Sequence, residues 1–200
     1  MRLIRASECL IMPWKNGGGT TTEIAVHPQG ASLAAFDWRI SMAHVGGDGP
    51  FSSFPGIDRT LAVLRGDGIH LAFGDGETIT LDRQTQPFAF AADRVVAGQL
   101  VAGPIDDLNV MSRRCGWAHA MRRITGASPQ AVRIEAGLLV LVAHAGGWGA
   151  TAAGRTETLA PGDSALLEGP AEVELSAASP ESEMFAITLR PVTCPASAAL

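Results

Sequence analysis

The fold of this chain is decided by the stretch Thr158-Leu-Ala-Pro-Gly-Asp-Ser-Ala-Leu-Leu167. Two short apolar segments flank a Pro-Gly-Asp turn, and Pro followed by Gly favours a tight reversal of the backbone. The stretch therefore predicts a strand, a tight turn and a second strand. Strand pairs of this kind, repeated along a chain, are typical of all-β domains.

Similar strands are predicted along most of the chain. Between Phe36 and Met42, apolar residues alternate with Asp37, Arg39 and Ser41, which is the period of a strand with one buried face. Further strands are expected at Leu61–Leu64, Ile69–Phe73, Thr78–Leu81 and Leu108–Ser112. Helical turns are expected only within Ser7–Met12 and Ala118–Ile124. So many strands without long helices favour a sandwich or barrel over a parallel α/β sheet.

An internal repeat divides the chain into two halves. Leu61-Ala-Val-Leu64 matches Leu139-Val-Leu-Val142, a spacing of 78 positions (61 to 139). The same spacing carries Gly68 to Gly146, Gly76 to Gly154, Thr78 to Thr156 and Leu81 to Leu159. The Pro-Gly-Asp turn in the second copy resembles the second conserved motif of cupins. We therefore expect an all-β bicupin, with two double-stranded β-helix barrels of the cupin, jelly-roll type.

The repeat also sets the expected domains. A first cupin-like half with the ligand-site motifs is expected at residues 1–112, a linker at 113–130 and a second cupin-like half at 131–200. The linker is placed where charged residues, Gly, Ser and Pro cluster. The second half is expected to end in a loose tail from about residue 192.

Composition argues against several classes of partner. The net charge of −5 offers no basic stripe to displace counterions, so no nucleic-acid partner is expected. Met1–Trp14 carries Arg2, Arg5 and Glu8, which interrupt the apolar core that a signal peptide needs. The longest apolar run, Gly137–Ala143, is too short to span a bilayer, so no membrane is expected. Three widely spaced cysteines suggest free thiols, and a cytoplasmic location is expected.

Motifs for metals and nucleophiles are missing from the sequence. The five histidines, His27, His44, His70, His119 and His144, stand singly. None forms the closely spaced pair on which a cupin metal site depends. There is no GxSxG nucleophile elbow, and Lys15 precedes its glycine run instead of following it as in a phosphate-binding loop. No metal, cofactor or catalytic residue is therefore expected.

The densest functional pattern is Met12-Pro-Trp-Lys-Asn-Gly-Gly-Gly-Thr-Thr-Thr-Glu-Ile24. Its three glycines let the backbone approach a bound group and expose amide donors. Lys15 is the only lysine among 15 basic residues, and Asn16 is one of two asparagines, the other being Asn109. An ammonium and an amide side by side beside a glycine run predict a ligand-binding loop.

Four blocks in this order resemble the HutD/Ves family. They are Met12-Pro-Trp-Lys-Asn-Gly-Gly-Gly-Thr20, Phe36-Asp-Trp-Arg-Ile-Ser41, Asp48-Gly-Pro-Phe-Ser-Ser-Phe-Pro-Gly-Ile-Asp-Arg59 and Asp107-Leu-Asn-Val-Met-Ser-Arg-Arg114. The resemblance covers roughly residues 1–115, and the rest matches only by cupin pattern. It implies a bicupin fold and a small-ligand binding or regulatory role in bacterial histidine utilisation. The implied ligand is formylglutamate or a related intermediate, and the resemblance brings no catalytic residue.

The residues expected to bind this ligand combine cations, amides and apolar walls. Arginine suits a carboxylate by bidentate geometry and lysine by its point charge. Alternation places Asn109, Met111 and Arg113 on one face of a strand. The full set is Trp14, Lys15, Asn16, Gly17, Gly18, Thr20, Arg39, Phe54, Arg59, Asn109, Met111 and Arg113.

Two other functions stay open. One is a metal-independent hydrolase or isomerase acting on a small carboxylic acid, with Lys15 as base or Schiff-base amine. Glu23, Asp37 or Asp58 would then carry protons. The other is an interaction protein with an incidental cavity. A homodimer is also expected, because a small cupin leaves a sheet face or edge that pairing covers.

Overall fold

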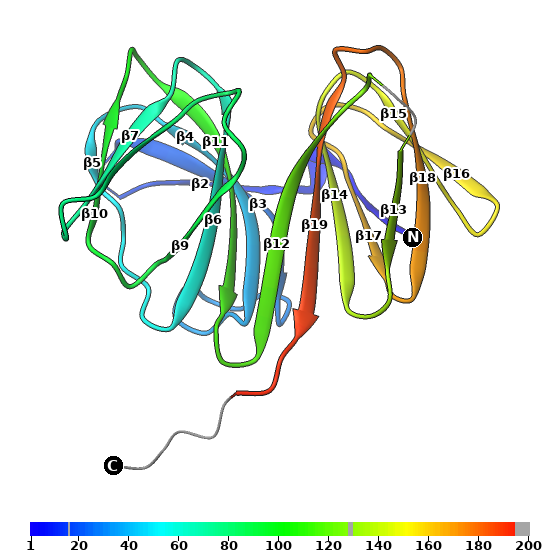
Figure 1. Ribbon diagram of the computed structural model, residues 1–200, viewed down its shortest axis with the longest axis horizontal. Helices are drawn as coiled ribbons and strands as arrows, with labels where there is room; N and C mark the ends of the chain where they lie inside the picture. The colour runs from blue at the N-terminus through cyan, green and yellow to red at the C-terminus, as the bar shows by residue number, and fades with distance from the viewer. Residues whose placement is uncertain (16, 128–129, 195–200) are drawn as a thin grey trace. The chain divides into compact units, whose positions relative to one another are not determined.

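The computed structural model describes residues 1–15, 17–127 and 130–194. These residues form two compact units, whose strands are drawn in Figure 1. The N-terminal unit consists of Leu10–Ala118 and the residues from 192 on, and the C-terminal unit consists of Met1–Cys9 and His119–Pro191. The sequence-based boundaries placed Met1–Cys9 in the first half, whereas the structure groups this segment with the second.

The N-terminal unit contains two sheets. Its strands are β2 (Leu10–Pro13), β3 (Gly19–His27), β4 (Trp38–Val45), β5 (Gly49–Pro50), β6 (Ile57–Arg65), β7 (Ile69–Phe73), β8 (Thr78–Leu81), β9 (Phe88–Ala91), β10 (Val96–Leu100) and β11 (Ile105–Arg113). Six of them form a sheet in the order β2-β3-β4-β11-β6-β9, and the other four a sheet in the order β5-β10-β7-β8. Apolar residues from both sheets pack into one core between them.

The C-terminal unit is also built from two sheets. Its elements are β1 (Arg2–Ile4), the 3-10 turn η1 (Ala6–Glu8), β12 (Trp117–Thr125), β13 (Gln130–Ile134), β14 (Leu138–Ala145), β15 (Trp148–Ala152), β16 (Arg155–Leu159), β17 (Ser164–Glu168), β18 (Ala171–Ala177) and β19 (Glu183–Pro191). The sheet orders are β1-β17-β14-β19-β12 and β13-β18-β15-β16.

The two units repeat one strand order, which accounts for the repeat in the sequence. β6 lies between β11 and β9 in the N-terminal unit, and β14 lies between β19 and β17 in the C-terminal unit. The matched segments Leu61–Leu64 and Leu139–Val142 lie in β6 and β14. The all-β prediction with two related halves is confirmed. The described strands of each half form two sheets instead of one closed ring of hydrogen bonds.

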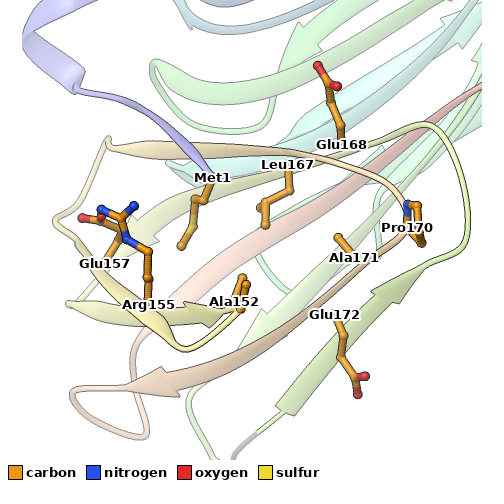
Figure 2. Close-up of a pocket in the computed structure, with 10 residues that line it drawn as sticks. Met1, Ala152, Arg155, Glu157, Leu167, Glu168, Pro170, Ala171 and Glu172 are labelled. Atoms are coloured by element: carbon orange, nitrogen blue, oxygen red, sulfur yellow. The ribbon is translucent and has the colours of Figure 1, made fainter.

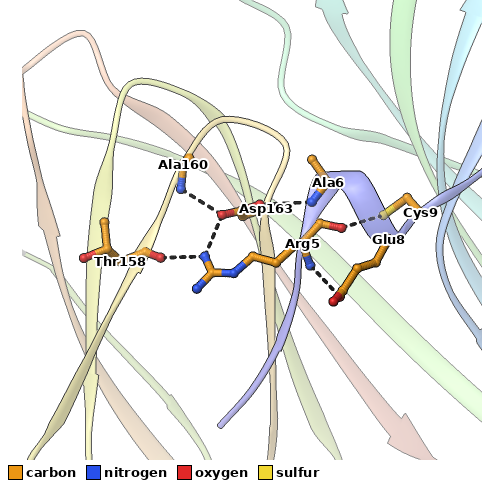
Figure 3. A network of polar contacts seen from close by, with 7 residues as sticks. All are labelled: Arg5, Ala6, Glu8, Cys9, Thr158, Ala160 and Asp163. Carbon is orange, nitrogen blue, oxygen red and sulfur yellow. Dashed lines mark hydrogen bonds and ion pairs between the residues drawn. The ribbon is translucent and has the colours of Figure 1, made fainter.

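The Pro-Gly-Asp turn joins β16 to β17 and also holds the N-terminal segment. Gly162 has a φ of +89°, a conformation that favours glycine. The carboxylate of Asp163 accepts hydrogen bonds from the backbone N–H of Ala6 at 3.0 Å and from Nη1 of Arg5 at 2.7 Å (Figure 3). Burial acts to raise the pKa of Asp163, but these hydrogen bonds outweigh it and lower the pKa. Because β1 also pairs with β17, the first nine residues are part of the C-terminal unit.

Both helical predictions need correction. Ala118–Ile124 lies in β12, where pairing at the edge of a sheet overrides local propensity, so the expected linker at 113–130 contains a strand. Of Ser7–Met12, only the first residues belong to a helical turn, since η1 ends at Glu8 and β2 begins at Leu10.

The cysteines also differ from the prediction. Cys115 and Cys194 form a disulfide whose Cα atoms lie 4.7 Å apart, so the expectation of free thiols is wrong for this pair. The two residues are 79 positions apart, and no local pattern indicates that the fold brings them together. Cys9 is free, and burial raises the pKa of its thiol.

Each unit has its own apolar core. The N-terminal core includes Leu61, Val63, Ile69, Leu71, Phe73, Leu81 and Ile105. The C-terminal core includes Leu139, Leu141, Trp148, Leu159, Val173, Met184 and Ala186. Across the described residues, no helix has the length and apolar character needed to cross a bilayer.

Candidate ligand-binding site

Polar side chains share a face with the N-terminal core. Ala43 in β4 and Val63 in β6 belong to that core, and both lie directly opposite Asp107 in β11. Because alternate residues of a strand share a face, polar residues two or four positions away lie on the same side. We call the resulting set the interior polar cluster: Glu23, Arg39, Ser41, Arg59, Asp107 and Asn109.

Arg39 is held by a carboxylate on the neighbouring strand. Its Nε lies 2.7 Å from Oε2 of Glu23, and its Nη1 donates to Oγ of Ser41 at 3.3 Å. Only 8% of the Arg39 side chain is exposed. Because the cost of desolvation offsets the attraction, such a pair adds little net stability. Its main effect is to fix the orientation of the guanidinium.

Arg59 is held by an amide and an aromatic ring. Its Nε donates to Oδ1 of Asn109 at 2.8 Å, and its Nη2 donates to the same oxygen. Nδ2 of Asn109 in turn donates to Oδ1 of Asp107. The guanidinium carbon lies 4.6 Å from the centre of the Phe51 ring, within the range of a cation–π contact. Both ends of the Asn109 amide are engaged, so this residue positions Arg59 instead of standing free to read a ligand.

Burial shifts the pKa values of the cluster. Asp107 is 1% exposed, and desolvation raises its pKa to about 6, although Arg59 and the amide of Asn109 favour its charged form. Desolvation lowers the pKa of Arg59 to about 10, against the attraction of Asp107 and with some repulsion from Arg39. Arg59 therefore stays charged at neutral pH, whereas the charge of Asp107 changes near that range.

The cluster retains the capacity to bind an anion. Guanidinium groups carry donors on three nitrogens in a planar fork. Contacts with the described residues engage Nε and Nη1 of Arg39 and Nε and Nη2 of Arg59. Among the described residues, one nitrogen of each arginine has no protein partner, and Arg suits bidentate recognition of a carboxylate.

The glycine run forms a closed loop next to this face. The backbone N–H of Trp14 donates to the carbonyl of Gly19 at 2.9 Å, and the N–H of Gly46 donates to the carbonyl of Gly18 at 2.8 Å. A Cβ at Gly19 would collide with the backbone of His44 and with the Trp14 ring, which explains the glycine there. Gly17 has a φ of +71° and is exposed.

The loop contributes fewer side chains to the interior than the sequence suggested. Trp14 packs against the core and donates from Nε1 to Oγ1 of Thr21 at 2.8 Å. Thr21 lies opposite the core residue Ala43, so the neighbouring Thr20 faces the other side of the sheet. Lys15 is exposed, and Asn16 lies outside the described residues.

The remaining predicted residues pack near the strand ends. Phe54 and Met111 belong to a second apolar cluster that also contains Phe36 and Ile57. Arg113 donates from Nη2 to the carbonyl of Phe36 at 2.9 Å and fastens the segment before β4. Of the predicted set, the structure therefore brings Arg39, Arg59 and Asn109 together in the polar cluster, with Met111 beside the two arginines.

Three residues of the cluster were missed as ligand-site candidates. Ser41 was placed only on the strand that carries Arg39. Glu23 was named only as a proton carrier, and Asp107 was not named, although it stands two positions before Asn109 on the same strand. Extending the alternation by one step would have found Asp107. The partnership of Glu23 with Arg39 needed the pairing of β3 with β4, which no local pattern contains.

The C-terminal unit has a cavity of a different character. Its volume is about 490 Å³, and its lining includes Met1, Arg155, Leu167, Glu168 and Glu172. Figure 2 shows the carboxylates of Glu168 and Glu172 directed to opposite sides, away from one another. None of the predicted ligand residues lines this cavity. Among the described residues, no three His, Cys, Asp or Glu side chains gather closely enough to hold a metal ion.

Solved structures resemble this chain over nearly its whole length. A conserved protein of Pseudomonas aeruginosa PAO1 is 33% identical, with a TM-score of 0.86 over 94% of this chain and 97% of that one. HutD from Pseudomonas fluorescens SBW25, in a formate condition, is 30% identical, with a TM-score of 0.81 over 96% of this chain and 98% of that one. A cupin 2 conserved barrel domain protein of Leptotrichia buccalis has a TM-score of 0.57 at 10% identity over 85% and 88% of the two chains, and shows the fold alone.

Relatives identified by sequence alone agree with these structural matches. A 21.2 kDa protein from the hutC 3′ region of Pseudomonas putida is 34% identical over 152 residues, or 73% of this chain and 79% of that protein. Protein Ves of Citrobacter koseri is 43% identical over 102 residues, about half of each chain at 50% and 52%. The family profile of HutD matches residues 6–185, a span that reaches from the N-terminal segment into β19 and contains the whole interior polar cluster. The chain belongs to the HutD family, to which its likeness to Ves also points.

Proposed function

We propose that this protein binds a small carboxylate inside the N-terminal unit, as an accessory or regulatory factor of histidine degradation, with formylglutamate as the ligand. One observation carries the proposal: two guanidinium groups face the same interior surface. Arg39 and Arg59 lie on either side of Met111, each directly opposite it across a strand pair.

The spacing of the arginines suits a ligand with two acidic groups. Their strands are separated by β11, so their backbones are about 10 Å apart at about 4.8 Å per strand. Long arginine side chains reach inward from both sides, and a dicarboxylate between them would contact both. The relative from the hutC 3′ region and the HutD structure in a formate condition support a carboxylate of the histidine pathway.

A thermal-shift screen tests the proposal directly. The purified protein is heated with histidine, urocanate, formiminoglutamate, formylglutamate or glutamate. A ligand at one hundred times its Kd stabilises the folded state by about 2.7 kcal/mol, which a melting curve resolves. Formylglutamate should give the largest shift. No shift with any of the five compounds would contradict the proposal.

An arginine variant locates the site. Arg59→Ala should weaken formylglutamate binding by at least about thirtyfold, because a desolvated charge pair contributes about 2 kcal/mol or more. Arg133→Ala is the matched control, since Arg133 is an exposed arginine in the other unit. Calorimetric titration measures both. Equal affinity in the two variants would place the pocket elsewhere.

A second candidate is a metal-independent hydrolase acting on the same acid. The raised pKa of the enclosed Asp107 favours it, because a carboxyl that titrates near neutral pH suits acid–base work. Incubation with formylglutamate, followed by an assay for released formate, separates the two functions. Formate release that Asp107→Asn abolishes would favour the hydrolase, and an unchanged ligand would favour binding alone.

The proposed assembly is a homodimer. β2 is an edge strand of the larger sheet, and its Leu10 and Ile11 are 61% and 65% exposed. Exposed apolar edges of this kind are commonly covered by a partner. Light scattering at micromolar protein should give twice the chain mass, and a mass of 20.8 kDa would reject the dimer.

A further inference from the structure

The interior polar cluster is balanced in charge before any ligand enters. It contains two guanidinium groups, Arg39 and Arg59, and two carboxylates, Glu23 and Asp107. With all four ionised the net charge is zero. An added carboxylate would leave one uncompensated negative charge in a region largely removed from water, which is costly. A bound anion therefore needs a compensating positive charge.

Asp107 is the group placed to provide that compensation by taking up a proton. Glu23 is 21% exposed and pairs directly with Arg39. Asp107 is 1% exposed and reaches Arg59 only through the amide of Asn109. A ligand that engages Arg59 competes for the same guanidinium and weakens the support of the Asp107 charge further.

Among the described residues around Asp107, the strands on either side supply no buried or half-buried cation besides the two arginines of the cluster. β4 contributes Arg39, already paired with Glu23 of β3, and β6 contributes Arg59. On its own strand, Asn109 is the next side chain on the same face, and Asp106 precedes Asp107 in the chain; the negative charge of Asp106 disfavours ionisation of Asp107. Asp106 itself lies 2.8 Å from Nδ1 of His44 on β4. This arrangement agrees with the raised pKa of Asp107.

Resting on the proposed carboxylate-binding function, we propose that the ligand enters the cluster together with one proton, which Asp107 takes up from solvent. The ligand carboxylate pairs with Arg59, and the proton forms an O–H bond on Asp107. The neutral carboxyl keeps an oxygen that accepts the hydrogen bond from Nδ2 of Asn109. The proton offsets the charge of the carboxylate that pairs with Arg59, so the cluster with its dianionic ligand carries one negative charge instead of two, and ligand affinity is coupled to pH.

Calorimetric titration of the intact protein with formylglutamate tests this coupling. At pH 7.5, heats measured in buffers of small and large ionisation enthalpy should report uptake of about one proton per ligand. Binding should weaken about tenfold for each pH unit above the pKa of Asp107 and level off below it. Formylglutamate carboxyls are already ionised in this range, so the proton is the protein's. Measurable binding without proton uptake would overturn this inference alone, whereas no binding at any pH would overturn the proposed function with it.

A matched pair of variants locates the proton. Asp107→Asn imitates the protonated acid and should bind formylglutamate with no proton uptake and an affinity independent of pH from 6 to 8. Asp106→Asn removes the neighbouring carboxylate on the opposite face and should retain uptake of about one proton. Retained uptake in Asp107→Asn would refute the assignment. Should this variant fail to fold, the proton count of the unmodified protein still decides the coupling.

Discussion

The N-terminal and C-terminal units use one strand order for two purposes. Val63 in the first unit faces Asp107 across a strand pair, and its counterpart Leu141 in the second faces Ala186. The first position is a buried carboxylate in a charged network, and the second is a methyl group in an apolar core. The comparison shows that one strand order accommodates a buried charged network in the first half and an apolar core in the second.

The two units should also differ in the interactions that stabilise them. Buried ion pairs contribute little net stability and are costly when broken, whereas apolar cores are stabilised by area removed from water. The C-terminal unit should therefore be sensitive to loss of volume, with a loss of stability only at acid pH, where Asp163 becomes protonated. The N-terminal unit should be sensitive to the charge of Asp107, which is the pattern expected where stability is given up for function.

The largest expected effect on stability is in the C-terminal unit, whose interior is apolar. Trp148→Ala removes a side chain that is 2% exposed in the C-terminal core, and such truncations cost about 3–5 kcal/mol. Chemical denaturation should show this loss at every pH tested. Formylglutamate affinity of the folded variant should stay unchanged, since Trp148 is in the other unit. A large loss of affinity would mean that the two halves are not independent in function.

A smaller effect on stability, confined to a defined pH range, is expected in the N-terminal unit. The pKa of Asp107 is raised to about 6, above its ordinary 3.8, so its protonated form is favoured by folding. Stability from this group is fully present below pH 4 and is lost as pH rises through 6. The shift corresponds to about 3 kcal/mol.

Asp107→Asn should remove this pH-dependent loss. The free energy of unfolding of the variant should equal that of the unmodified protein near pH 4 and exceed it by about 3 kcal/mol at pH 7, as measured by chemical denaturation across this pH range. Asp106→Asn serves as control and should keep the loss. Parallel stability curves for Asp107→Asn and the unmodified protein would show that Asp107 is ionised in both states.

The smallest effect, on ligand affinity, is expected at Lys15 beside the glycine run. Lys15 is exposed, so Lys15→Arg should leave formylglutamate affinity within about twofold, because a solvated cation contributes little. Titration calorimetry measures it. A tenfold loss would place Lys15 in direct contact with the ligand and enlarge the site beyond the interior polar cluster.

Much of the fold could be read from the sequence because it depends on local periodicity. Alternation along 36–43 and the turn at 161–163 predict strands, and the 78-residue repeat predicts two related halves. β12 was missed, since short segments of mixed composition do not distinguish a strand from a helical turn. The position of Met1–Cys9 was missed because it depends on pairing with β17.

The site was partly predictable for the same reason. Strand alternation singled out Arg39 and Asn109, and the structure keeps both alternations. Arg59 was chosen as a cation in the third of the four sequence blocks, without any prediction of the strand that holds it. Thr20 was chosen where Thr21 faces inward, because a glycine run gives no signal for the register of the strand that follows it. The charge balance of the interior polar cluster could not be predicted from the sequence, since it depends on which carboxylate lies beside which arginine.

The contact between the first residues and the Pro-Gly-Asp turn also bears on the order of events during translation. Arg5 and its partner Asp163 are 158 positions apart. At 5–20 residues per second, β1 leaves the ribosome on the order of 10–30 s before β17 exists. Most of the N-terminal unit is synthesised in that interval, including all of its strands from β2 to β11. β1 therefore lacks its partner strand until β17 has been synthesised, and the five-stranded sheet of the C-terminal unit cannot be completed before then.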